Sequence, residues 1–210
     1  MKAVKKKSLL IHVALFHEAK PLIKNLGLKQ YDTSPYRVFK SEKIDLIVSG
    51  LGGENTALAL KWILNKESYD CCLNFGTAAC SDDSIKIGTP AFVSKIFFEN
   101  RTVFTSNLQL SDKNNICIMP LETVTKPKTR WENGTSDLLA DMEGAFFVKS
   151  LSVIDDKNII VLIKVISDYG SDKILSKDQL QTIIVSSLEN GVLNVIDELC
   201  NFKPGLEKNK

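Results

Sequence analysis

The chain has 210 residues, of which 44% are hydrophobic, and this suits one domain with a substantial core over residues 1–210. The formal net charge of +2 gives no electrostatic reason to expect a nucleic-acid partner. No apolar run reaches the roughly 20 residues of a membrane-spanning helix, and the cysteines show no Cys-x-x-Cys spacing, so we expect a cytoplasmic protein with reduced thiols and no membrane partner.

Strand-like and helix-like segments alternate along the sequence. Short runs rich in Ile, Val and Leu predict strands, and apolar side chains spaced three or four residues apart predict helices. The expected elements are a strand at 9–15, a helix at 18–26, a short edge-like strand at 36–39, a strand at 44–49, a glycine-rich turn at 50–53, a helix at 57–64 opened by Asn55 or Thr56, a strand at 69–75 closed by small turn residues at 76–79, a short strand at 116–119, a helix start near 143, a strand at 159–168 and a helix at 176–202.

This alternation predicts an α/β fold with three layers, in which helices cover both faces of a central mixed, mostly parallel sheet. The run at 159–166 is almost continuously apolar, as in a strand buried on both faces. Asp168 ends this strand and Glu143 stands beside a helix start. Ligands of α/β sheets bind at the carboxyl ends of strands, and an acid in apolar sequence is costly unless something pairs with it. We therefore place the chemistry at these two acids.

The glycine-rich turn at 50–53 invites a comparison with dinucleotide-binding proteins. Its Gly-x-Gly-Gly spacing is not the full fingerprint, and no acid stands at a second strand tip at the expected distance. Such a turn can equally let a substrate or a neighbouring subunit come close to the backbone. We rank the dinucleotide interpretation low.

The motif Asp-Met-Glu-Gly-Ala at 141–145, followed by Ile-Ser-Asp at 166–168, resembles the paired signature of the nucleoside phosphorylase and nucleosidase superfamily. That superfamily includes methylthioadenosine/S-adenosylhomocysteine nucleosidases, futalosine hydrolases and purine and uridine phosphorylases. The segments at 14–22, 76–79 and 85–93 resemble it too. The resemblance implies a nucleoside phosphorylase-like fold, a small-molecule nucleoside as partner, no cofactor, no metal and a homodimer.

By this resemblance, the acids divide the cleavage of a purine N-glycosidic bond among them. Asp168 would protonate the leaving base at N7, with Ser167 orienting it. Glu143 would accept the 2′ and 3′ hydroxyls of the ribose, with Met142 as its apolar neighbour under the sugar. Glu18 would activate water. From local sequence alone, Asp168 could equally cap a helix, and the two glutamates could be solvated residues at helix starts.

The resemblance also assigns smaller roles. Gly76, Thr77 and Ala78 correspond to the turn that lines the sugar or phosphate site. Lys164 stands where the family often has an arginine. In these relatives an aromatic residue packs on the base, and the nearest candidate here is Trp131, which could equally be a hydrophobic anchor.

The choice between hydrolysis and phosphorolysis depends on an anion site. Phosphate needs several cationic or N–H donors, usually arginines. The arginines are Arg37, Arg101 and Arg130, and none lies in the first strand-turn, where phosphorylases of this family place one. We therefore predict a purine nucleoside hydrolase acting on methylthioadenosine, S-adenosylhomocysteine or a futalosine-like nucleoside. A phosphorylase that recruits Arg37 or Arg101, a non-catalytic nucleoside-binding relative and a dinucleotide-binding reductase stay open as alternatives.

Overall fold

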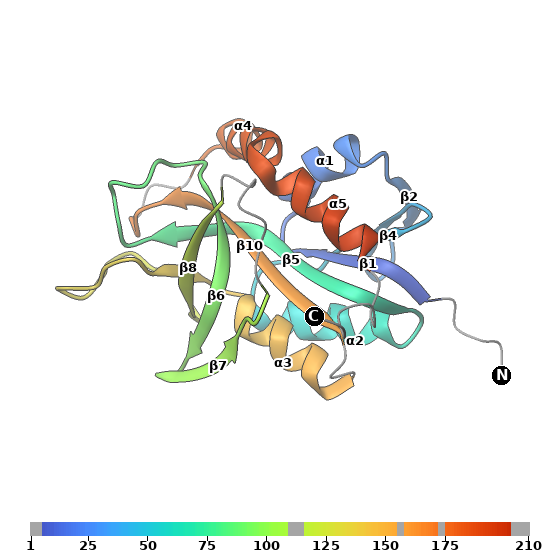
Figure 1. The fold of residues 1–210 in the computed structure, drawn as a ribbon, viewed down its shortest axis with the longest axis horizontal. Coiled ribbons are helices and arrows are strands. Elements are labelled where there is room, and N and C mark those ends of the chain that lie inside the picture. The colour runs from blue at the N-terminus through green and yellow to red at the C-terminus, as the bar shows by residue number, and fades with distance from the viewer. Residues whose placement is uncertain (1–5, 109–115, 155–157, 172–174, 203–210) are drawn as a thin grey trace, which may run out of the picture.

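The computed structural model describes residues 6–108, 116–154, 158–171 and 175–202 (Figure 1). Within these ranges the elements follow in the order β1 (Lys6–Val13), α1 (Phe16–Asn25), β2 (Lys29–Asp32), β3 (Arg37–Lys40), β4 (Ile44–Val48), α2 (Gly53–Leu64), β5 (Ser68–Cys80), β6 (Pro90–Phe98), β7 (Arg101–Thr105), β8 (Cys117–Thr123), β9 (Leu139–Asp141), α3 (Gly144–Ile154), β10 (Ile159–Asp168), α4 (Lys177–Ser187), a π-helical turn (Leu188–Val192) and α5 (Leu193–Asn201).

All the strands belong to one mixed sheet, and part of it closes on itself. Parallel pairing joins β4 to β1, β1 to β5 and β5 to β10. From β10 the sheet continues through β6, β8 and β9, and β9 returns to β5 in antiparallel pairing. The strands β5, β10, β6, β8 and β9 therefore form a ring. The parallel strands align their carboxyl ends, which brings segments far apart in the sequence to one edge.

Helices cover both faces of the sheet, with α1, α4 and α5 on one side and α2 and α3 on the other (Figure 1). Two apolar cores result, one on each side. The side chains of β10 alternate between them: Ile163 and Val165 pack with α4 and α5, whereas Leu162 and Ile166 pack with α3. Lys164 lies midway between Leu162 and Ile166 in this alternation, so its side chain also points to the α3 side. The predicted α/β class with a mixed sheet and helices on both faces is confirmed.

Three local predictions were wrong. Strand β3 is not at the edge, because β2 pairs with its outer side; the polar sequence of β2 hides it from a hydrophobicity pattern. Helix α2 begins at Gly53, before Asn55 or Thr56. Residues 76–79 are not a turn: they continue β5, because β10 pairs with them as far as Ala79. Among the described residues, none of the helices has the length and apolar character needed to cross a membrane.

Candidate active site

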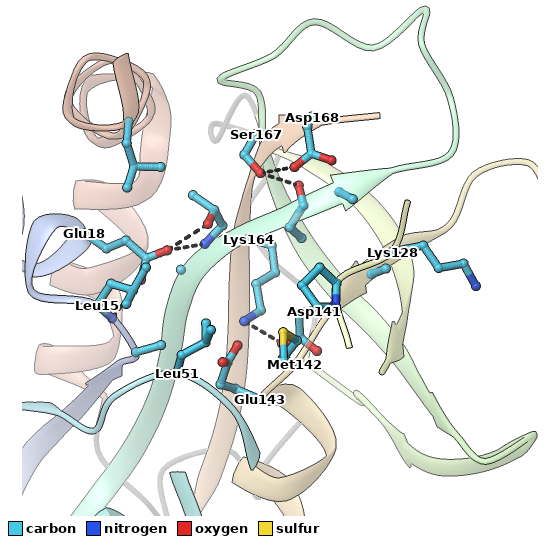
Figure 2. A pocket seen from close by; sticks show the side chains of 18 of the residues that line it. Leu15, Glu18, Leu51, Lys128, Asp141, Met142, Glu143, Lys164, Ser167 and Asp168 are labelled. Carbon is cyan, nitrogen blue, oxygen red and sulfur yellow. Dashed lines mark hydrogen bonds and ion pairs between the residues drawn. The ribbon is translucent and has the colours of Figure 1, made fainter. Parts of the chain in front are cut away.

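A cavity of about 310 Å³ opens at the edge of the sheet where β1, β5 and β10 end. Its walls come from elements that are far apart in the chain, and Figure 2 shows their side chains converging on it. The residues to which the resemblance assigned a catalytic or substrate-binding role all line this cavity, namely Glu18, Gly76, Thr77, Ala78, Met142, Glu143, Lys164, Ser167 and Asp168.

Glu18 enters the cavity from the first turn of α1 and is buried. Its Oε1 accepts hydrogen bonds from the backbone N–H and the hydroxyl of Thr77, at 2.9 and 2.8 Å, and its Oε2 accepts one from the N–H of Leu15 at 3.1 Å. Burial raises the pKa of the Glu18 carboxyl, and the bonds from Thr77 and Leu15 oppose that shift. The site therefore holds a carboxyl of increased basicity in a fixed orientation.

Glu143 lies between β9 and α3, and it is also buried. Its Oε1 accepts a hydrogen bond of 2.7 Å from the N–H of Gly52. Gly52 has a φ of 93°, a backbone conformation that favours glycine, and this aims its N–H at the carboxylate. Burial raises the pKa of Glu143, while the charge of Lys164 lowers it. The glycine-rich turn thus serves to hold an acid of the cavity.

Lys164 forms a buried ion pair across the ring with Asp141, at 2.7 Å between Nζ and Oδ2. Asp141 also accepts hydrogen bonds of 2.8 Å from the N–H of Gly144 and from the hydroxyl of Thr123. The carboxylate is therefore saturated with donors, as a buried ion pair requires. No sequence pattern predicted that Asp141 would pair with Lys164, although Asp141 belongs to the same motif as Glu143.

Asp168 stands at the tip of β10, opposite the two glutamates (Figure 2). Its Oδ1 accepts a hydrogen bond of 2.9 Å from the N–H of Gly170. The hydroxyl of Ser167 lies 2.8 Å from Asp168 Oδ2 and 3.2 Å from the carbonyl oxygen of Ala78. This hydroxyl has one hydrogen. It can donate to an ionised Asp168, or donate to Ala78 and accept from a protonated one, so the arrangement suits both states of the carboxyl.

Some candidate residues do not line the cavity. Trp131 instead donates a hydrogen bond of 2.9 Å from its indole to the carbonyl of Tyr169, and its ring packs on Gly170, so it supports the segment that follows Asp168. Arg37 lies over the ring of Phe16, 4.4 Å from its centroid, and none of the arginines is among the lining residues.

Among the described residues, the cations that line the cavity are Lys164 and Lys128, and both are paired. The ammonium of Lys128 lies 2.7 Å from Glu122. An apolar wall completes the cavity, formed by Leu51, Val124, Pro127, Leu175 and Leu180. Leu51 belongs to the glycine-rich turn at 50–53, which the sequence marked as a possible substrate contact. The other four lie on loops and on α4, where no motif marks them. The described part of the cavity therefore offers acids and apolar surface, and little free positive charge.

Solved structures of nucleosidases share this architecture. 5′-Methylthioadenosine nucleosidase of Arabidopsis thaliana is similar with a TM-score of 0.78 and 19% identity, over 95% of this chain and 98% of that one. Methylthioadenosine/S-adenosylhomocysteine nucleosidase of Colwellia psychrerythraea, in complex with adenine, has a TM-score of 0.74 and 19% identity, over 93% and 96%. Futalosine hydrolase of Helicobacter pylori has a TM-score of 0.73 and 14% identity, over 94% and 100%.

The chain has the nucleosidase fold. No protein-family model matches the sequence, and no curated protein matches it. The relationship that the motifs suggested is thus confirmed at the level of the fold, at identities too low to carry over an activity. The cavity described above lies at the carboxyl edge of the central strands of this nucleosidase fold.

Proposed function

We propose that the protein hydrolyses the N-glycosidic bond of a purine nucleoside and releases the free base. The observation that carries this proposal is the convergence of Glu18, Glu143 and Asp168, from three separate elements, on one cavity. Cleavage of this bond needs a proton for the departing base, a grip on the sugar and a nucleophile, and the three acids can divide these tasks.

Asp168 is the proton donor in this proposal. A departing purine is a poor anion, so protonation at N7 makes it a better leaving group. Ser167 can donate to the Asp168 carboxylate after the proton has left and turn to Ala78 when the proton returns. It would therefore stabilise both states through one turnover without a change in position.

Glu18 is the base that takes a proton from water as it attacks C1′, and Glu143 holds the sugar hydroxyls. Burial raises the pKa of both carboxyls, which increases their basicity, while the nearby charge of Lys164 favours their ionised forms. Thr77 and Gly52 fix one oxygen of each carboxylate. A negative pair of carboxylates beside the sugar would also stabilise the positive charge that develops there in the transition state.

Hydrolysis is favoured over phosphorolysis by the charges of the cavity. Lys164 is committed to Asp141 and Lys128 to Glu122, and no arginine is among the described lining residues. The solved neighbours act on methylthioadenosine, S-adenosylhomocysteine or futalosine, as their names state. We propose methylthioadenosine or S-adenosylhomocysteine as the leading substrates, with futalosine-like nucleosides next, and a cytoplasmic homodimer as the working form.

The test is incubation with a panel of purine nucleosides, with and without phosphate, followed by assay of free base and sugar product. We expect free base and the free sugar that keeps its 5′ substituent, such as methylthioribose from methylthioadenosine, independent of phosphate. Formation of the corresponding sugar 1-phosphate only when phosphate is present would select the phosphorylase. Thermal stabilisation by adenine nucleosides without release of base would select a binding protein.

A further inference from the structure

His12 is a buried titratable residue that the proposed mechanism does not use. It lies on β1 and is completely buried. Its Nε2 is 2.9 Å from the hydroxyl of Ser49, and its Nδ1 is 2.7 Å from Nδ2 of Asn74. The three side chains form a polar chain, Ser49–His12–Asn74, that runs from the residue after β4, across the carboxyl end of β1, to the middle of β5.

The direction of each hydrogen bond in this chain follows from its partners. Ser49 donates its one hydrogen to the carbonyl of Gly50 at 2.7 Å, so it can only accept from His12. Burial lowers the pKa of His12 to about 3, and its imidazole is therefore neutral at pH 7, with its hydrogen on Nε2. The free lone pair on Nδ1 then accepts from the amide nitrogen of Asn74.

Both ends of this chain reach the candidate active site. Asn74 lines the cavity. With its nitrogen committed to His12, its amide oxygen is buried without a partner among the described residues. At the other end, Ser49 and Gly50 begin the turn whose next glycine, Gly52, donates its N–H to Glu143 at 2.7 Å.

We propose that His12 is a positioning residue of the active site, which fixes the turn that holds Glu143 and orients the amide of Asn74 on the cavity wall. Its role in the sugar grip rests on the proposed function, whereas its hold on the turn does not. One neutral imidazole suits this task because it supplies a donor and an acceptor on opposite sides of a rigid ring. Its other neighbours, the ring of Phe147 at 5.6 Å and the charge of Lys164, do not provide that link.

The test combines His12→Met, which fills the space without hydrogen bonds, with His12→Gln, which keeps one donor and one acceptor. In His12→Met we expect amide hydrogen exchange at Gly52 to rise by about tenfold and KM for the nucleoside to rise by about tenfold, the scale of one lost hydrogen bond. The value of kcat should change far less. In His12→Gln, the exchange rate at Gly52 and KM should both lie close to their wild-type values. Ser49→Ala removes the hydrogen-bond acceptor at the other end of the Ser49–His12–Asn74 network and should also accelerate amide exchange at Gly52. This second variant keeps the test decisive if His12→Met does not fold.

The matched control is Tyr69→Phe, at the other end of β5. It removes another buried hydrogen bond, of 2.8 Å to Asp45, far from the cavity, and should lower Tm while leaving KM and Gly52 exchange as in the wild type. Exchange at Gly52 that stays at the wild-type rate in His12→Met and Ser49→Ala would overturn the inference. If the wild type releases no base from any nucleoside, the proposed function fails, and the exchange rates still decide the role of His12.

Discussion

Buried carboxylates have different partners at the two edges of the sheet, the edge where the parallel strands begin and the edge where they end. At the edge where β1, β4 and β5 begin, Asp45 is completely buried and is paired with the ammonium groups of Lys7 and Lys40 and the hydroxyl of Tyr69. At the edge where the strands end, Glu18 and Glu143 accept hydrogen bonds mainly from uncharged donors. The first arrangement neutralises a charge, and the second leaves carboxylates that can exchange a proton.

This difference separates a structural edge from a reactive one. An acid whose oxygens are occupied by two ammonium groups and a hydroxyl, as in Asp45, has no free oxygen with which to bind a ligand. An acid that is buried beside a cavity, with its pKa raised by burial, can accept a proton or a sugar hydroxyl. Asp141 is the exception at the reactive edge, because Lys164 saturates it. It supplies a fixed point around which the other acids are arranged.

The largest effect should come from two separate variants, each of which replaces one acid, Asp168 at the reactive edge or Asp45 at the structural edge. Asp168→Asn removes the proposed proton donor and should lower kcat by about 10²–10⁴-fold with little change in Tm. Asp45→Asn should do the reverse, lowering stability by about 1–3 kcal/mol while leaving kcat near the wild-type value for the folded fraction. Steady-state base release and urea unfolding measure the two. Full turnover by Asp168→Asn would remove this residue from the mechanism.

The second prediction compares the two lysines of the cavity. Lys164→Met leaves Asp141 buried without its counter-ion and should destabilise the fold by about 3–5 kcal/mol. Lys128→Met breaks a pair whose side chains are partly exposed, 22% and 30%, and should cost less than about 1 kcal/mol. Unfolding in urea measures both. Equal costs would mean that the Lys164–Asp141 pair does not anchor the site.

Much of this arrangement could be read from the sequence, because the relevant signals are local. The Ile-rich run that ends in Asp168 predicted a buried strand with an acid at its tip, and that is β10. The apolar residues after Glu143 predicted a helix that begins beside it, and that is α3. The paired motifs then indicated that these two acids share a site.

The parts that could not be predicted depend on contacts between distant segments. The ring closes through pairings of β6, β8 and β9, and no single segment encodes these. The pairing of Asp141 with Lys164 requires both side chains to point into the ring of strands, one from β9 and the other from β10. The link from His12 to Ser49 and Asn74 depends on the register of parallel strands, in which His12 pairs with Asn74. A hydrophobicity pattern carries no information on register between strands that are not hairpins.

The smallest effect concerns the stability of the reactive edge and its dependence on pH. Burial raises the pKa of Glu143 from its usual value of 4.5, so the folded protein binds this proton more tightly than the unfolded chain does. The favourable contribution of Glu143 to the free energy of unfolding is therefore present below that usual value, and it is lost as the pH rises through the raised pKa. Glu143→Gln can still accept from the N–H of Gly52 and carries no charge at any pH.

We therefore expect Glu143→Gln to have a higher Tm than the wild type at pH 8, by roughly 2–4 °C for each kcal/mol gained, and the difference to shrink towards pH 5. Its KM should rise, because the sugar loses a charged acceptor. Asp82→Asn is a control of opposite sign: the hydrogen bonds from Ser84 lower the pKa of Asp82, so this variant should lose Tm at pH 8. That loss should persist down to the usual value of 3.8 and fade only as the pH falls below it, through the lowered pKa. Calorimetry over both pH ranges distinguishes the two variants. A Tm difference for Glu143→Gln that grows as the pH falls would contradict the inference that burial penalises the ionised form of Glu143.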